Sequence, residues 1–195
     1  MNRTIIVSGI PGTGKTTVCD LVEKLAGQAG VKVSVINYGT VTLETLQKYG
    51  ETMGRDVMRK ADVGFQRKLQ REVAEVISQK ISLCDDITII DTHMAIKTSS
   101  GYMPGLPNHV LQLLKPEMFV LVEAEPNDIS SRRMKDTSRK RDETMEEVVK
   151  EEMMLSRLMA GACSVLTGAP VKIAVNAKGK AEEAARDILK ACGVV

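Results

Sequence analysis

Aromatic residues are scarce in this chain of 195 residues, which has no tryptophan, three tyrosines and two phenylalanines. Proteins that bind single-stranded nucleic acid commonly stack bases on aromatic side chains, and this composition offers few such surfaces. A large excess of charge of one sign is also missing, because 27 basic and 25 acidic side chains leave a net charge of +2. A general nucleic-acid binder usually carries a strongly basic face or tail. We therefore expect no nucleic-acid partner.

Long apolar runs are missing as well. The sequence has no run near the ~20 apolar residues that span a bilayer, and residues 1–5 lead into a short strand pattern without the features of a secretory signal. We expect no membrane association and a location in the cytoplasm. The four cysteines are scattered, without a C-x-x-C pair, so the sequence favours reduced thiols over a structural zinc site.

Short apolar, β-branched runs alternate with longer helical patterns along the chain. This alternation is typical of an α/β fold with a parallel sheet flanked by helices, and runs this apolar fit strands covered on both faces. With no repeat and no Pro/Ser-rich linker, the sequence predicts one domain over residues 1–195, with its ligand beyond the carboxyl ends of the strands. The five predicted strands are Thr4–Ser8, Val31–Ile36, Ile87–Asp91, Met118–Val122 and Val171–Val175.

Three of the helical patterns are long. Apolar residues recur at helical spacing over nearly twenty residues from Phe65 to Cys84. Thr144 and Glu147 have the spacing of a capping box, which predicts a helix from there to about Leu158. The segment from Ala181 to Cys192 predicts a closing amphipathic helix.

The strongest motif follows the first strand. Residues 9–16 match the phosphate-loop pattern G-x-x-x-x-G-K-[ST] at every fixed position, between an apolar strand and an amphipathic helix. The backbone N–H groups of such a loop, together with the N-terminus of the helix, surround a phosphate. Lys15 is expected to reach the β- and γ-phosphates of ATP and to act in catalysis, and the Thr16 hydroxyl is expected to bind Mg²⁺. The residues of the motif are Gly9, Ile10, Pro11, Gly12, Thr13, Gly14, Lys15 and Thr16.

Asp91 ends the third predicted strand after four apolar or β-branched residues. An acid at this place can hold Mg²⁺ through a water molecule in P-loop enzymes. On its own, an acid there could also be an ordinary polar strand end. Because the phosphate loop is present, we favour the metal role for Asp91.

Basic residues gather after the fourth strand, where a lid over the phosphates is expected. Arginine suits this place because its planar guanidinium binds phosphate oxygens with two hydrogen bonds, and phosphoryl transfer depends on positioning and electrostatic stabilisation. The alternative is a solvated charged surface, since acidic residues are interleaved. The cluster contains Arg132, Arg133, Arg139, Lys140 and Arg141.

Two further segments suggest an acceptor site. Residues 55–60 are basic, and Arg59 is the best placed to bind a phosphate. Residues 92–107 are rich in Gly and Pro, which predicts an ordered loop at the end of the third strand. His93 lies in this loop. We interpret it as a positioning or structural residue, because an acceptor phosphate is already anionic and needs no base.

These motifs together resemble the archaeal adenylate kinases, over essentially the whole chain and in the same order. The resemblance implies reversible transfer of phosphate from ATP to AMP with Mg²⁺, giving two ADP. It also implies that the five strands lie in the order 2-3-1-4-5 and that the protein is a homotrimer. The motifs are Gly9–Thr17, Asn37–Thr40, Arg55–Lys60, Asp91–His93, Gly101–Pro107, Arg139–Asp142 and Leu166–Ala169.

The resemblance also assigns residues to roles. Gly9 to Thr17 bind the ATP phosphates, and Arg59 and Lys97 face the AMP phosphate. Tyr38, Gly39, Thr40 and Gly105 are further substrate-binding candidates. The arginines at 132, 133, 139 and 141 are candidates for the lid and the transition state, with an acceptor-binding insert at about 38–84 and a short lid at about 134–145.

Two other functions remain open on the residues alone. One is a kinase for CMP, UMP or GMP, since a few hydrogen bonds decide which base is bound. The other is a nucleotide-dependent protein associated with RNA or the ribosome, with vestigial activity. A GTPase is disfavoured because the N-K-x-D guanine signature is absent, and residues 176–179 only partly resemble it.

Overall fold

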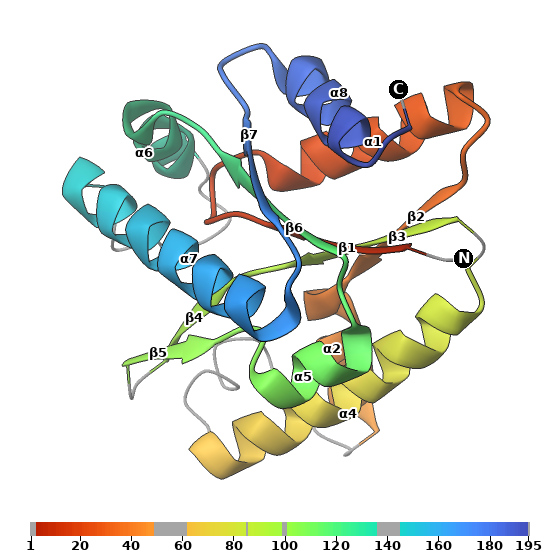
Figure 1. Ribbon diagram of the computed structural model, residues 1–195. Coiled ribbons are helices and arrows are strands. Elements are labelled where there is room, and N and C mark those ends of the chain that lie inside the picture. Colours follow the sequence, from red (N-terminus) through yellow and green to blue (C-terminus); the bar gives the residue numbers. More distant parts are fainter. Residues whose placement is uncertain (1–2, 49–61, 85, 99–100, 136–144, 195) are drawn as a thin grey trace.

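The computed structural model describes residues 3–48, 62–84, 86–98, 101–135 and 145–194. Its centre is a parallel sheet of five strands in the order β2-β3-β1-β6-β7 (Figure 1). This confirms the predicted α/β fold and, once the extra strands β4 and β5 are left out of the numbering, the predicted strand order. The strands are β1 (Arg3–Ser8), β2 (Val33–Asn37), β3 (Ile87–Thr92), β6 (Met118–Glu123) and β7 (Val171–Val175).

Helices cover both faces of this sheet and create two cores. On one face, α1 (Lys15–Gln28) and α8 (Ala181–Ala191) pack on residues such as Ile5 and Val120. The other face carries α2 (Tyr38–Gln47), α4 (Val63–Ser82), α5 (Asn108–Leu114) and α7 (Glu146–Thr167) (Figure 1). A last helix, α6 (Pro126–Lys135), packs against α7 beside the phosphate loop.

The long helices were predicted with mixed accuracy. The pattern over 65–84 corresponds to α4, whose first turn is capped by Asp62, and the closing helix is α8. The predicted end of α7 was wrong, because this helix continues to Thr167 and stops where Gly168 adopts a left-handed conformation. Its N-cap residue is Met145 and not Thr144, which lies outside the described residues. The helices α2, α5 and α6 were not predicted.

The segment after β3 is a β-hairpin and not the predicted loop. Strands β4 (Ala95–Thr98) and β5 (Gly101–Pro104) pair antiparallel and form a separate two-stranded sheet. The Gly and Pro residues that suggested a loop stand at the ends of these short strands, where they do not interrupt the pairing.

The two helices of the predicted acceptor insert are part of the domain core. Tyr38 and Leu46 of α2 and Val73 and Ile77 of α4 are buried together with Phe119 of the central sheet. The described parts of the segment from 38 to 84, α2 and α4, therefore belong to the domain core, and residues 49–61 lie outside the described part of the chain. Among the described helices, none is long and apolar enough to cross a membrane.

Candidate active site

The phosphate loop joins β1 to α1 at the carboxyl edge of the sheet. Gly14 has a φ of 81°, and a side chain there would meet the Asn176 amide at 2.5 Å, so glycine is required. The side chains of Thr13 and Asn176 are among those that hold the loop. The Thr13 hydroxyl donates to the Ile10 carbonyl, and the Asn176 amide donates to the Thr13 carbonyl at 2.7 Å. The loop is thus fixed from within and from the segment that follows β7.

Lys15 and Asp91 form an ion pair at the centre of the site. The Lys15 side chain is 10% exposed and that of Asp91 4%. Burial acts to lower the pKa of Lys15, whereas the carboxylate in contact with it favours the ammonium form. A buried charge is stable only with such a partner. The structure therefore joins the two residues that the sequence singled out for phosphate and metal binding.

Asn37 is a third member of this cluster. It ends β2 directly opposite Asp91 of β3 in the parallel register. Its side-chain Nδ2 donates to Asp91 Oδ2 at 2.8 Å. Its Oδ1 accepts from the Thr40 backbone N–H at 2.9 Å and caps α2.

Two of the predicted catalytic arginines support the phosphate loop from α6. Arg132 donates to the Gly12 and Thr13 carbonyls, and Arg133 donates from Nε to the Pro11 carbonyl at 2.8 Å. Arg133 is 4% exposed and also pairs with Glu152 of α7 at 2.5 Å. In this structure both guanidinium groups bind carbonyls of the loop, so they position it. Their predicted roles in the transition state stay predictions.

The turn after β3 also contacts the phosphate loop. His93 Nδ1 lies 2.9 Å from the Gly9 carbonyl, and since a carbonyl only accepts, Nδ1 carries the proton. This agrees with the positioning role predicted for His93. Gly105 donates to the Met94 carbonyl at 2.8 Å, and a Cβ at Gly105 would collide with the His93 backbone. Gly105 thus closes the hairpin against this turn.

The remaining predicted substrate-binding and lid residues divide into three groups. Tyr38 belongs to the core, where its hydroxyl donates to the Gln70 carbonyl at 3.0 Å, so its side chain has a structural role here. Gly39 and Thr40 form the first turn of α2, next to the Asn37–Asp91 pair, and Lys97 lies exposed on the hairpin strand β4. Arg59, Arg139 and Arg141 lie outside the described residues.

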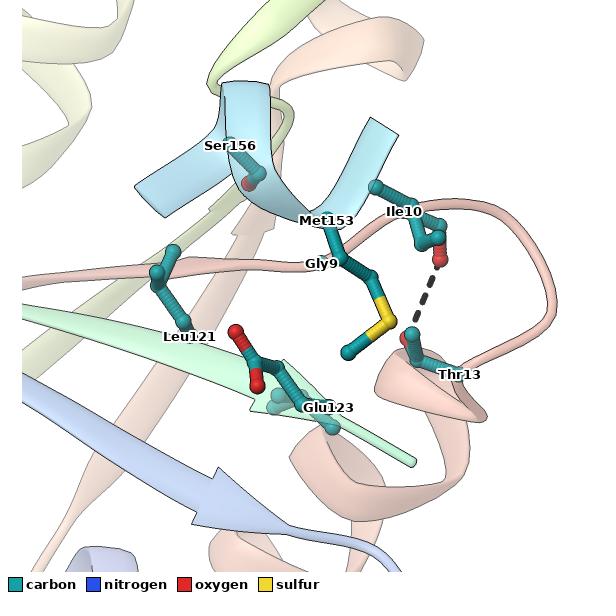
Figure 2. A pocket seen from close by; sticks show the side chains of 8 residues that line it. Gly9, Ile10, Thr13, Leu121, Glu123, Met153 and Ser156 are labelled. Carbon is teal, nitrogen blue, oxygen red and sulfur yellow. Dashed lines mark hydrogen bonds between the residues drawn. The ribbon is translucent and has the colours of Figure 1, made fainter. Parts of the chain in front are cut away.

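A small cavity lies behind the phosphate loop, between β6 and α7. It is lined by Gly9, Ile10 and Thr13 of the loop, by Glu123 of β6 and by Met153 and Ser156 of α7 (Figure 2). Glu123 is 7% exposed and accepts two hydrogen bonds from Arg157 of α7, at 2.8 and 2.5 Å. This paired contact raises the pKa of Arg157 and ties α7 to the sheet next to the loop.

Several residues of the site were missed in the sequence. Glu152 and Arg157 lie in a predicted helix, where they have the pattern of an ordinary charged surface, and Glu123 directly follows the fourth predicted strand. Asn176 was considered only as part of a guanine signature. Asn37 follows the second strand, so the rule that ligands lie at the carboxyl ends of parallel strands was the signal that could have identified it.

The oxygen donors at this edge fit a magnesium ion. Thr16 stands exposed in the first turn of α1, and Asp91 offers a carboxylate at the end of β3. Mg²⁺ prefers oxygen ligands and usually takes one or two carboxylates together with phosphates and water. In the part of the chain that the structure describes, no group of three or more His, Cys, Asp or Glu could hold a metal ion by itself.

Comparison with known proteins places this geometry in a family. A family model described as an AAA domain matches residues 8–150. An adenylate kinase of Saccharolobus solfataricus is 42% identical over 187 residues, which cover 94% of this chain and 96% of the relative. An adenylate kinase of Thermoplasma acidophilum is 40% identical over 189 residues, covering 97% and 98%.

Solved structures share the fold at low sequence identity. A shikimate kinase from Acinetobacter baumannii, in complex with shikimate, aligns with a TM-score of 0.61 at 17% identity, over 98% of this chain and 93% of that one. A sugar kinase from Janibacter sp. aligns with a TM-score of 0.53 at 14% identity, over 100% and 96%.

Proposed function

The chain belongs to the adenylate kinase family, and we propose that it transfers the γ-phosphoryl group of ATP to AMP, reversibly, through the site around Lys15. An oxygen of the AMP phosphate attacks the γ-phosphorus, the bond from that phosphorus to the β–γ bridging oxygen breaks, and two ADP molecules result. The observation that carries this proposal is the Lys15–Asp91 pair at the end of a complete phosphate loop.

In this proposal the loop binds the donor phosphates and Lys15 leaves Asp91 to contact them. The ammonium then neutralises charge that develops on the transferring oxygens, in a site where the water content is low and electrostatic contacts are strong. Thr16 and Asp91 would hold Mg²⁺, Asp91 through a water molecule. When bound, the ion would neutralise negative charge on the nucleotide phosphates.

Arg132 and Arg133 would act from behind the loop. Their hydrogen bonds hold the carbonyls of residues 11–13 toward α6. This arrangement favours loop N–H groups that face a phosphate, apart from the Thr13 N–H, which donates to the Ile10 carbonyl at 3.3 Å. We propose that Arg139 and Arg141, in the predicted lid at about 134–145, contact the phosphates from the open side, and that Gly39 and Thr40 lie beside the acceptor. A location in the cytoplasm stays a prediction.

Arg59 is proposed to bind the AMP phosphate together with Lys97. Replacing Arg59 by alanine should raise the KM for AMP at least about tenfold, because a hydrogen-bonded charge pair is lost, and should change the KM for ATP little. Steady-state kinetics with each substrate varied in turn measures both values. Equal effects on the KM values for AMP and ATP would contradict the assignment of Arg59 to the acceptor site.

The test of the function is ADP formation from Mg-ATP with AMP, CMP, UMP, GMP or water as acceptor. Strong dependence on AMP supports the proposal. Preference for another nucleoside monophosphate would leave the proposed mechanism unchanged and would change only the base specificity assigned to the protein. Absence of turnover together with stoichiometric RNA binding would favour the nucleotide-dependent interaction protein.

We also propose that the chain assembles as a homotrimer. Met154, Leu158 and Val165 stand at helical spacing on the outer face of α7 and are 65, 65 and 87% exposed. The edge strand β7 exposes Val171, Ile173 and Val175 in addition. A ring of three copies joins two different patches of each copy, and we propose that these two sets of exposed apolar side chains are those patches.

Charges placed on the α7 stripe should dissociate such a trimer. We expect the double variant Leu158→Glu, Val165→Glu to elute as a monomer of about 21.3 kDa, where the unmodified chain elutes at three times that mass. Light scattering after size exclusion measures it. Lys24→Glu on α1, on the opposite face of the sheet, is the control and should leave the mass unchanged. A monomeric unmodified chain would contradict the trimer.

A further inference from the structure

Asn37 connects the phosphate loop to the first turn of α2, beside which we have proposed that the acceptor binds, by a continuous set of polar contacts. Lys15 pairs with Asp91, Asp91 accepts a hydrogen bond from Asn37 at 2.8 Å, and Asn37 accepts from the Thr40 N–H at 2.9 Å and from its hydroxyl at 3.2 Å. The contacts begin at the phosphate-binding lysine and end in the first turn of α2.

Helix capping alone does not explain an asparagine at this position. Asp, Ser and Thr cap helices about as well as Asn, because a cap needs only an acceptor oxygen. A neutral amide differs from these in offering a donor and an acceptor at opposite corners of one rigid plane. Here the acceptor caps α2 and the donor binds the carboxylate of Asp91. Both halves of the amide are therefore in use.

The strand geometry makes this arrangement rigid. Asn37 and Asp91 are direct neighbours in the parallel pair of β2 and β3, each at the end of its strand. Asp91 is 4% exposed, so its carboxylate has little freedom to turn without changing its bonds. Since α2 begins at Tyr38, a movement of the Asn37 side chain acts directly on the helix N-terminus.

We propose that Asn37 is a positioning residue that couples nucleotide binding at the phosphate loop to AMP binding at α2. The inference rests on the proposed function. When donor phosphates draw Lys15 away, Asp91 loses its cation, and its remaining hydrogen bond to Asn37 transmits the change to the first turn of α2. Each substrate thereby raises the affinity for the other by the same factor, as linkage requires.

The test uses the variant Asn37→Ser, which keeps a capping oxygen and is too short to reach Asp91. The dissociation constant of AMP is measured by calorimetry with and without Mg²⁺ and a non-hydrolysable ATP analogue. In the unmodified protein we expect the analogue to tighten AMP binding by about 5-fold to 150-fold. In Asn37→Ser this factor should fall close to one, while AMP binding without the analogue changes little.

Thr42→Val is the matched control. It removes a hydrogen bond within the same helix, from the Thr42 hydroxyl to the Tyr38 carbonyl at 2.7 Å, and should preserve the coupling factor.

Three results would count against the inference or its premise. Unchanged coupling in Asn37→Ser, or no coupling in the unmodified chain, would overturn the inference and leave the proposed function intact. Failure of the unmodified chain to bind AMP at all would overturn the proposed function, and the inference with it.

Discussion

Replacing Lys15 by alanine is expected to lower kcat about 100-fold to 1,000-fold, which is the usual loss when one group that stabilises the transition state is removed. The lysine is held where it can perform this role, since its side chain is 10% exposed and paired with Asp91 at the end of the phosphate loop. Water cannot replace a buried cation efficiently, because the surrounding loop and strands exclude it.

The same change should also affect the unliganded fold. Asp91 is 4% exposed. In the variant it would keep its hydrogen bond from Asn37 but lose its ion pair with Lys15. A buried carboxylate that has no cation beside it tends to take up a proton. We therefore expect its pKa to rise in Lys15→Ala. Kinetics of ADP formation measures the loss of kcat. The dependence of the unfolding temperature on pH reports the protonation of the Asp91 carboxylate. Lys24→Ala, an exposed lysine of the same helix, should leave both unchanged. Near-normal turnover in Lys15→Ala would show that Lys15 does not stabilise the transition state.

Replacing Arg133 by alanine is expected to produce the largest loss of stability. Its side chain is 3% exposed and joins three parts of the molecule, because it extends from α6, donates to the Pro11 carbonyl and pairs with Glu152 of α7. Breaking a buried pair by removing one partner typically costs about 3–5 kcal/mol. For a chain of this size that corresponds to a fall in Tm of roughly 6–20 °C.

Arg186→Ala provides a matched comparison. Arg186 also pairs with a glutamate, Glu182, but on the surface of α8, where both side chains are more than half exposed. Exposed pairs of this kind contribute about 0.3–0.5 kcal/mol, so its Tm should hardly move. Differential scanning calorimetry of both variants measures the contrast.

Kinetics separates the two roles of Arg133. If it positions the loop, the folded fraction of Arg133→Ala should show a several-fold higher KM for ATP and a kcat well above that of Lys15→Ala. A kcat as low as that of Lys15→Ala, together with an unchanged Tm, would indicate that Arg133 stabilises the transition state, as predicted from the sequence.

Local patterns determined much of this protein. A strand pattern needs about five neighbouring residues of alternating or continuous apolar character, and a helix pattern needs three or four turns. The five strands, the helix over 63–82 and the phosphate loop at residues 9–16 were readable for that reason. The family followed as well, because its motifs are short runs in a set order along the chain.

Short helices and strands could not be predicted from such local patterns. The hairpin at 95–104 has four residues in each strand, too few to outweigh the Gly and Pro signals around it. Helices α2, α5 and α6 are seven to ten residues long, and their stability comes from packing on the rest of the domain more than from their own propensity. The end of α7 was predicted too early because both faces of its last turns are apolar, so the sequence there lacks the alternation of apolar and polar residues that marks a helix.

Only the tertiary structure decided how the functional side chains meet. Asn37 and Asp91 are 54 residues apart in the sequence, Asn176 and Thr13 are 163 apart, and Arg133 and Pro11 are 122 apart. No local pattern records such pairs, because each depends on the order and register of the strands. The sequence predicted which residues carry the phosphate chemistry, and the packing of distant segments decided that Lys15 pairs with Asp91, that Arg133 contacts the loop, and that Asn37 donates to Asp91.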